Sequence, residues 1–72
     1  MEATQQTTTS NTYFDLISVL YHAMQAEQTS ATYVQDAQRS GDKDLVQFFG
    51  EVQQTASRQA DKAKQMLGRV RS

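Results

Sequence analysis

The apolar positions of this chain first form a helical pattern over residues 12–39. Apolar or small residues occur at positions 13, 16, 17, 20, 24, 31 and 34, with spacings of three, four or seven. Residues at these spacings share one face of an α-helix. The pattern therefore predicts a helix over 12–39 with one apolar face.

A second helical pattern covers residues 43–70. Its apolar face consists of Leu45, Phe48, Phe49, Val52, Ala56, Ala63, Met66, Leu67 and Val70. Ser40, Gly41 and Asp42 separate the two stretches, because Gly41 can adopt the left-handed conformation that ends a helix and Asp42 can cap the next one. A connection this short makes the helices antiparallel. The predicted fold is thus all-α, an antiparallel hairpin within 12–70 with its turn at 40–42.

The remaining N-terminal stretch, residues 1–11, is polar and reads "MEATQQTTTSN". It lacks the basic segment and apolar core of a secretory signal, so we expect a short disordered tail. No apolar run approaches the roughly 20 residues of a membrane span. The chain has no cysteine, which excludes disulfides and thiol chemistry and agrees with a cytoplasmic protein.

Chain size points to self-association. Seventy-two residues lie near the limit at which one chain buries enough surface to be stable, and a lone hairpin leaves part of each apolar face exposed to water. Two hairpins that dock across a two-fold axis would bury these residues in a four-helix bundle. The predicted dimer interface comprises Leu20, Met24, Ala31, Phe48, Val52, Ala56 and Met66.

Polar residues interrupt the middle of both apolar faces. At 100° per residue, Glu27 points in the same direction as Leu20 and so faces inward. A hairpin folded at Gly41 places Glu27 level with Thr55, and Gln59 lies one turn further along. Because buried polar groups need hydrogen-bond partners, we predict a buried polar layer of Glu27, Thr55 and Gln59 at the centre of the dimer.

The segment "DKDLVQFFGEVQQTASRQADKAKQML" resembles the second helix of ferritin-like and rubrerythrin-like proteins. The resemblance extends over about residues 13–68 and is greatest to two-helix half-ferritins, which dimerise to complete a bundle. It rests on the Gly-Asp-x-x-Leu turn at Gly41, on the apolar pair of Phe48 and Phe49, and on a late alanine-rich turn. It implies a ferritin-like four-helix fold for the dimer.

The same resemblance implies a di-iron centre held by a Glu on the first helix and a Glu-x-x-His on the second. The Glu-x-x-His positions fall on Ala56 and Gln59. The first-helix Glu falls on Gln28 without a gap, or on Glu27 after a slip of one residue, and helical phase favours Glu27. One carboxylate per chain supplies too few ligands for two irons. We therefore expect a degenerate metal site and no cofactor.

Three functional hypotheses follow. The first is a non-enzymatic ferritin-like dimer that acts as a scaffold or adaptor by contact with another protein. The second is a metal-binding remnant that uses Glu27 from two chains. The third is a small regulator that binds RNA or acidic surfaces through basic residues near the C-terminus, namely Arg58, Lys62, Lys64, Arg69 and Arg71.

The first hypothesis agrees best with the composition. The net charge of −1 argues against a general nucleic-acid binder, and no aromatic residue lies among the C-terminal cations to stack on bases. An independent hydrolase or transferase is not expected, because the sequence has no nucleophile with a base and no phosphate-binding glycine loop.

Overall fold

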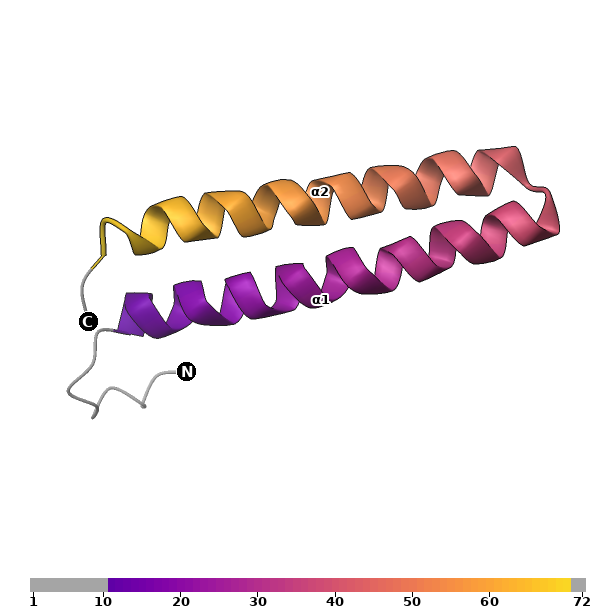
Figure 1. The fold of residues 1–72 in the computed structure, drawn as a ribbon. Coiled ribbons are helices and arrows are strands. Elements are labelled where there is room, and N and C mark those ends of the chain that lie inside the picture. The colour runs from indigo at the N-terminus through magenta and orange to yellow at the C-terminus, as the bar shows by residue number, and fades with distance from the viewer. Residues whose placement is uncertain (1–10, 71–72) are drawn as a thin grey trace.

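The computed structural model describes residues 11–70, which form a hairpin of two long helices (Figure 1). Helix α1 spans Asn11–Ser40 and helix α2 spans Lys43–Leu67. They run antiparallel in a single layer that measures 51 × 24 × 13 Å. The predicted all-helical hairpin is confirmed, and no strand occurs within 11–70. The tail predicted for residues 1–11 lies outside the described residues except for Asn11, the first residue of α1.

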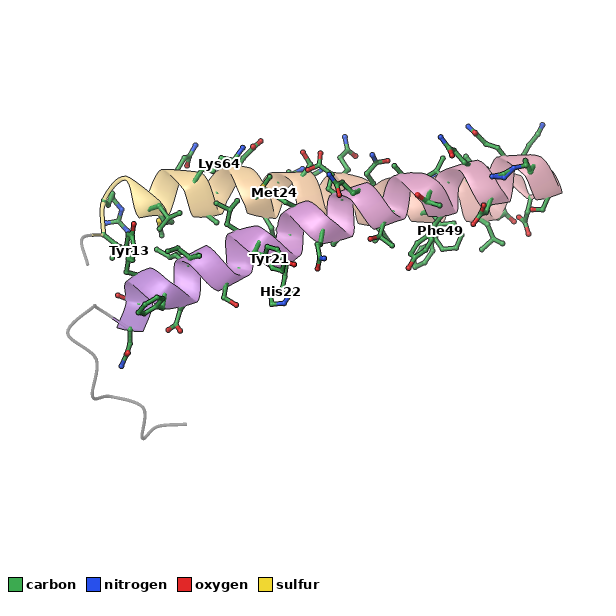
Figure 2. All side chains as sticks on the ribbon, turned by 60° about the horizontal axis from the view of Figure 1, so that its bottom comes forward. Tyr13, Tyr21, His22, Met24, Phe49 and Lys64 are labelled. Atoms are coloured by element: carbon green, nitrogen blue, oxygen red, sulfur yellow. The ribbon has the colours of Figure 1, made fainter. Side chains whose placement is uncertain are left out.

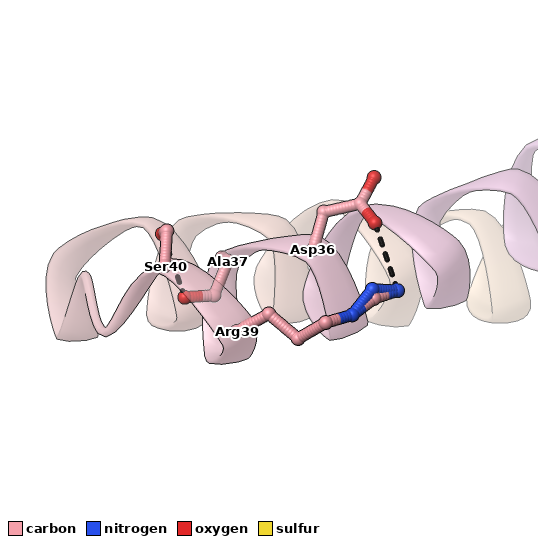
Figure 3. A network of polar contacts seen from close by, with 4 residues as sticks. All are labelled: Asp36, Ala37, Arg39 and Ser40. Atoms are coloured by element: carbon pink, nitrogen blue, oxygen red, sulfur yellow. Dashed lines mark hydrogen bonds and ion pairs between the residues drawn. The ribbon is translucent and has the colours of Figure 1, made fainter.

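The turn between the helices is held by backbone hydrogen bonds around Gly41. Gly41 has a φ of 78°, and its N–H donates to the carbonyl of Gln38 at 3.1 Å. The N–H of Asp42 donates to the carbonyl of Ala37 at 3.2 Å, which completes a Schellman motif. The Ser40 hydroxyl donates to the same Ala37 carbonyl at 2.9 Å (Figure 3). The predicted left-handed glycine is therefore confirmed.

Side chains finish the two helix ends at the turn. A carboxylate oxygen of Asp42 accepts a hydrogen bond from the N–H of Leu45 at 3.1 Å, so the predicted N-cap is confirmed. In the last turn of α1, Arg39 pairs with Asp36 at 3.2 Å (Figure 3). That ion pair is exposed, and such pairs contribute at most about 1 kcal/mol. The cap and the glycine therefore fix the reversal of the chain.

The far end of α2 stops at Leu67 rather than continuing to Val70. Gly68 follows, and its N–H still donates to the carbonyl of Lys64 at 3.3 Å, while Arg69 and Val70 donate to the carbonyl of Met66. Glycine is a poor helix former, so the regular helix gives way here to a final turn.

The two helices meet along a line of small residues, which we call the seam. Its fully buried members are Ala23, Ser30, Ala37, Ala56, Ala60 and Ala63. They belong to two regular series with alternating spacings of three and four, positions 13, 16, 20, 23, 27, 30, 34 and 37 in α1 and positions 46, 49, 53, 56, 60, 63 and 67 in α2. This spacing is that of a coiled-coil core. Small side chains at its centre let the helix axes approach closely.

The conformations of two glycines predict opposite effects of the same substitution. Gly41→Ala should lower the free energy of unfolding by roughly 1 kcal/mol, because an alanine at positive φ is strained. Gly50→Ala should raise it by up to about 1 kcal/mol, because Gly50 lies inside α2 and a Cβ there meets no atom within 4 Å. Urea unfolding followed by circular dichroism at one protein concentration measures both. If both substitutions shifted the free energy of unfolding in the same direction, the conformations assigned to Gly41 and Gly50 would be contradicted.

Candidate protein-interaction surface

Each helix carries a second apolar stripe outside the seam. In α1 it consists of Phe14, Ile17, Tyr21 and Met24, each one position after a seam residue. In α2 it begins with Leu45, Phe48 and Val52, each one position before a seam residue. All of these side chains are exposed, Tyr21 by 58% and Phe48 by 55%. The hairpin thus buries only small residues completely and leaves these seven large ones exposed.

The two outer stripes lie on opposite faces of the hairpin. One residue corresponds to 100° on a helix, so each stripe points roughly at right angles to the seam. In α1 each stripe residue comes one position after a seam residue, whereas in α2 it comes one position before. Because the helices run antiparallel, the two stripes point to opposite sides of the hairpin. Figure 2 shows Met24 on the side where Lys64 projects, and the Phe49 ring on the other side.

We call the side with the α1 stripe face A, defined by Phe14, Ile17, Tyr21 and Met24. The opposite side is face B, defined by Val19, Tyr33, Leu45, Phe48 and Val52. Face A draws its large apolar side chains from α1 alone, whereas both helices contribute to face B. The two surfaces therefore differ in the way a partner can cover them.

Face B contains an aromatic cluster and a groove. The Tyr33 ring of α1 lies 5.6 Å from the Phe49 ring of α2, and the Phe49 ring lies 5.7 Å from that of Phe48. These distances are typical of favourable aromatic pairs. Beside the cluster runs an open groove lined by Ala26, Phe48, Glu51, Val52, Thr55, Ala56 and Gln59. The cluster links the helices, and the groove leaves room for side chains of a partner.

Face A continues toward the outer side of α1. The Tyr21 ring stacks edge-on against His22, with 5.4 Å between the ring centroids. Both project away from α2 (Figure 2). The Nδ1 atom of His22 lies 3.0 Å from the carbonyl oxygen of Ser18, and the imidazole is exposed. The Ser18 hydroxyl also lies 3.5 Å from Nδ1, so the contacts of the imidazole within residues 11–70 are with neighbours on its own helix.

The structure divides the predicted dimer interface among three places. Phe48, Val52 and Met66 belong to the face B side, Met24 and Ala31 lie on the face A side, and Leu20 and Ala56 lie in the seam. These seven residues do not share one surface. Periodicity in the sequence gives one broad apolar face per helix. That face includes both the seam residues, which close the hairpin, and the residues on face A and face B.

The predicted polar layer is likewise not assembled within one chain. Glu27 is half-buried in the seam and lines a hollow on the face A side with Gln53 and Ser57, among others. Thr55 and Gln59 are exposed in the face B groove. A shared layer of all three therefore stays a prediction about the dimer.

Ser30 is a buried polar residue that the apolar pattern of α1 did not predict. Ser30 is only 2% exposed, and its hydroxyl donates to the carbonyl of Ala26 at 2.6 Å, one helical turn back. This bond satisfies the hydroxyl inside the helix, so Ser30 can occupy a seam position that needs a small side chain. Its place in the series of alternating threes and fours was the signal that could have revealed it.

Within residues 11–70 no three His, Cys, Asp or Glu side chains are grouped so that they could hold a metal ion. Ala56, at one of the ligand positions implied by the ferritin resemblance, is buried in the seam. Neither helix is long and apolar enough to cross a membrane.

Comparisons with protein-family models, curated proteins and solved structures found no match to this chain. The resemblance to half-ferritins stays a prediction.

The position of Glu27 leads to an expectation about metal binding. After incubation with iron, manganese or zinc and removal of free metal, mass spectrometry should find no stoichiometric ion, because one half-buried carboxylate per chain is too poor a ligand set. Glu27→Ala is the matched variant. Near-stoichiometric metal that is lost in Glu27→Ala would contradict this expectation.

Proposed function

We propose that this chain is a non-enzymatic association module that dimerises through face B into a ferritin-like four-helix bundle and acts as a scaffold or adaptor by contact with another protein. The single observation behind this proposal is the exposure of nine large apolar side chains in the described hairpin. They are Phe14, Ile17, Val19, Tyr21, Met24, Tyr33, Leu45, Phe48 and Val52.

The exposed area is large enough to support association. Face B exposes about 400 Å² of apolar surface, since five side chains of this size are each nearly half exposed. Two copies would bury roughly 800 Å² of apolar surface if the two faces cover each other fully. Since apolar atoms make up a little over half of a typical interface, the whole contact would measure about 1,400 Å². That is the size of a specific protein interface.

Face B suits self-association better than face A because it spans both helices. Two hairpins joined through such faces place four helices around one core, which is the bundle architecture. A dimer joined through face B would also cover the groove that Thr55 and Gln59 line. The predicted polar residues of α2 would then lie inside the dimer and find partners there.

Face A would remain uncovered on both outer sides of the dimer. Its stripe of Phe14, Ile17, Tyr21 and Met24 exposes a similar apolar area, and a patch of this size commonly marks an interaction site. A dimer with one such stripe on each side could join two copies of a partner protein. This arrangement supports an adaptor role.

The alternative metal function receives no comparable support from this geometry. Glu27 lines a hollow on the face A side, so two Glu27 carboxylates would not meet in a dimer joined through face B. A shared metal site would require a different interface.

Paired variants on the two faces test the proposed dimer. Phe48→Glu should weaken dimerisation roughly 100-fold or more, because it places a charge in the centre of face B twice per dimer. Phe14→Glu, an equally exposed phenylalanine on face A, should leave the dimer intact. Light scattering and sedimentation at several concentrations measure both, with circular dichroism to confirm the helices.

Two results would count against the proposed dimer. A folded wild-type monomer of 8.1 kDa at micromolar concentration would refute it. Loss of association in Phe14→Glu alone would move the interface to face A.

A further inference from the structure

We infer that the two α2 helices of the dimer lie antiparallel across face B, with Thr55 of one copy next to Thr55 of the other at the two-fold axis. This inference rests on the proposed face B dimer and specifies its orientation and register. Three features of α2 lead to it: the spacing of its outer stripe, the distribution of its charges, and the side chains that an antiparallel pairing brings together.

The outer stripe of α2 extends to both sides of Thr55. Beyond Val52 it continues through Thr55, Gln59, Lys62 and Met66, with alternating spacings of three and four and Thr55 as its middle member. An antiparallel copy with Thr55 opposite its own counterpart brings Leu45 within one residue of Met66. It likewise brings Val52 within one residue of Gln59. The apolar ends of the stripe cover each other, and the polar residues stay together near the centre.

The charges beside this stripe are separated by sign along the helix. Asp44 and Glu51 flank its first half, whereas Arg58 and Lys62 lie on or beside its second half. An antiparallel pairing sets each acidic half against the basic half of the other copy. A parallel pairing would set like charges side by side. Opposite charges across an interface favour the antiparallel orientation.

One ion pair follows from this register. Glu51 and Arg58 occupy the same flank of the stripe, two helical turns apart, and both are exposed. Neither has an ion-pair partner among residues 11–70. In the antiparallel dimer Glu51 of each copy lies across from Arg58 of the other, which forms the pair twice. Such flanking pairs set the orientation of helices in coiled coils.

The same register gives Phe48 a partner. It places the Phe48 ring opposite Lys62, whose aliphatic stem can lie on the ring while its ammonium group faces the aromatic surface. A lysine within an otherwise uncharged stripe then has a specific place in the interface.

Cysteine cross-linking tests the register. The chain contains no cysteine, so a single introduced thiol reports on its own position. Under mild oxidation Thr55→Cys should form a disulfide-linked dimer in high yield, because residues beside a two-fold axis come within disulfide reach. Gln54→Cys, also exposed but on the face A side, is the matched control and should remain largely reduced.

Charge reversal tests the orientation independently. Glu51→Arg and Arg58→Glu should each weaken the dimer roughly tenfold at low salt, because each replaces two attractive contacts with two repulsions. The double variant should recover most of the wild-type affinity. The recovery should shrink at 1 M salt, where the screening length is about 3 Å. Affinities come from sedimentation, with circular dichroism as the control for folding.

The outcomes separate this inference from the proposed function. Suppose that the wild-type chain forms a stable dimer, but Thr55→Cys cross-links no better than Gln54→Cys and the double charge reversal does not restore the affinity. These results would overturn the antiparallel register and leave the proposed association module standing. A wild-type monomer would overturn both.

Discussion

The close contact of two helices along an alanine-rich seam is the constraint on which this structure depends. Its fully buried residues are five alanines and Ser30, so the axes can approach closely but little apolar area is removed from water. A buried methyl contributes about 0.8 kcal/mol, whereas a fully buried Leu or Phe contributes about 1.5–3 kcal/mol. Nine large apolar side chains lie outside this seam on the two faces, while others, such as Leu20 and Phe49, occupy half-buried positions along it. Exposure of the nine is thus a consequence of the way the hairpin closes.

Because the hairpin is one layer thick, its two faces act as separate surfaces. A domain usually buries the apolar side of one layer against another layer. Residues 11–70 provide no second layer, and a second copy is the simplest way to supply one. The antiparallel fold sends the outer stripes to opposite sides, so the self-association proposed for face B and the partner binding proposed for face A would not compete for the same residues.

The sequence predicted the turn and the helices well because those features depend on local chemistry. Gly41 and Asp42 have few alternatives at a helix end, and an apolar repeat of three and four indicates a helix wherever the chain then packs. The surfaces were harder to predict. Residues such as Leu20 and Met24 lie within 40° of each other on a helical wheel, yet one is half-buried toward the seam and the other is exposed on face A. Periodicity defines the width of an apolar face, but the side-chain volumes of the facing helix decide which part of it closes the hairpin. The polar residues show the same division, since Gln53 occupies a half-buried seam position while Thr55 and Gln59 lie exposed on face B.

The turn at Gly41 also determines how the hairpin responds to mechanical force. The start of α1 and the end of α2 lie at the same end of the hairpin, opposite the turn (Figure 1). Tension applied to these ends pulls the helices apart sideways, so the contacts along the seam separate one after another toward Gly41. In this unzipping geometry each small contact bears the load alone. If the two ends lay at opposite ends of the structure, tension would load all the seam contacts at once in shear. Such a structure would withstand a far larger force.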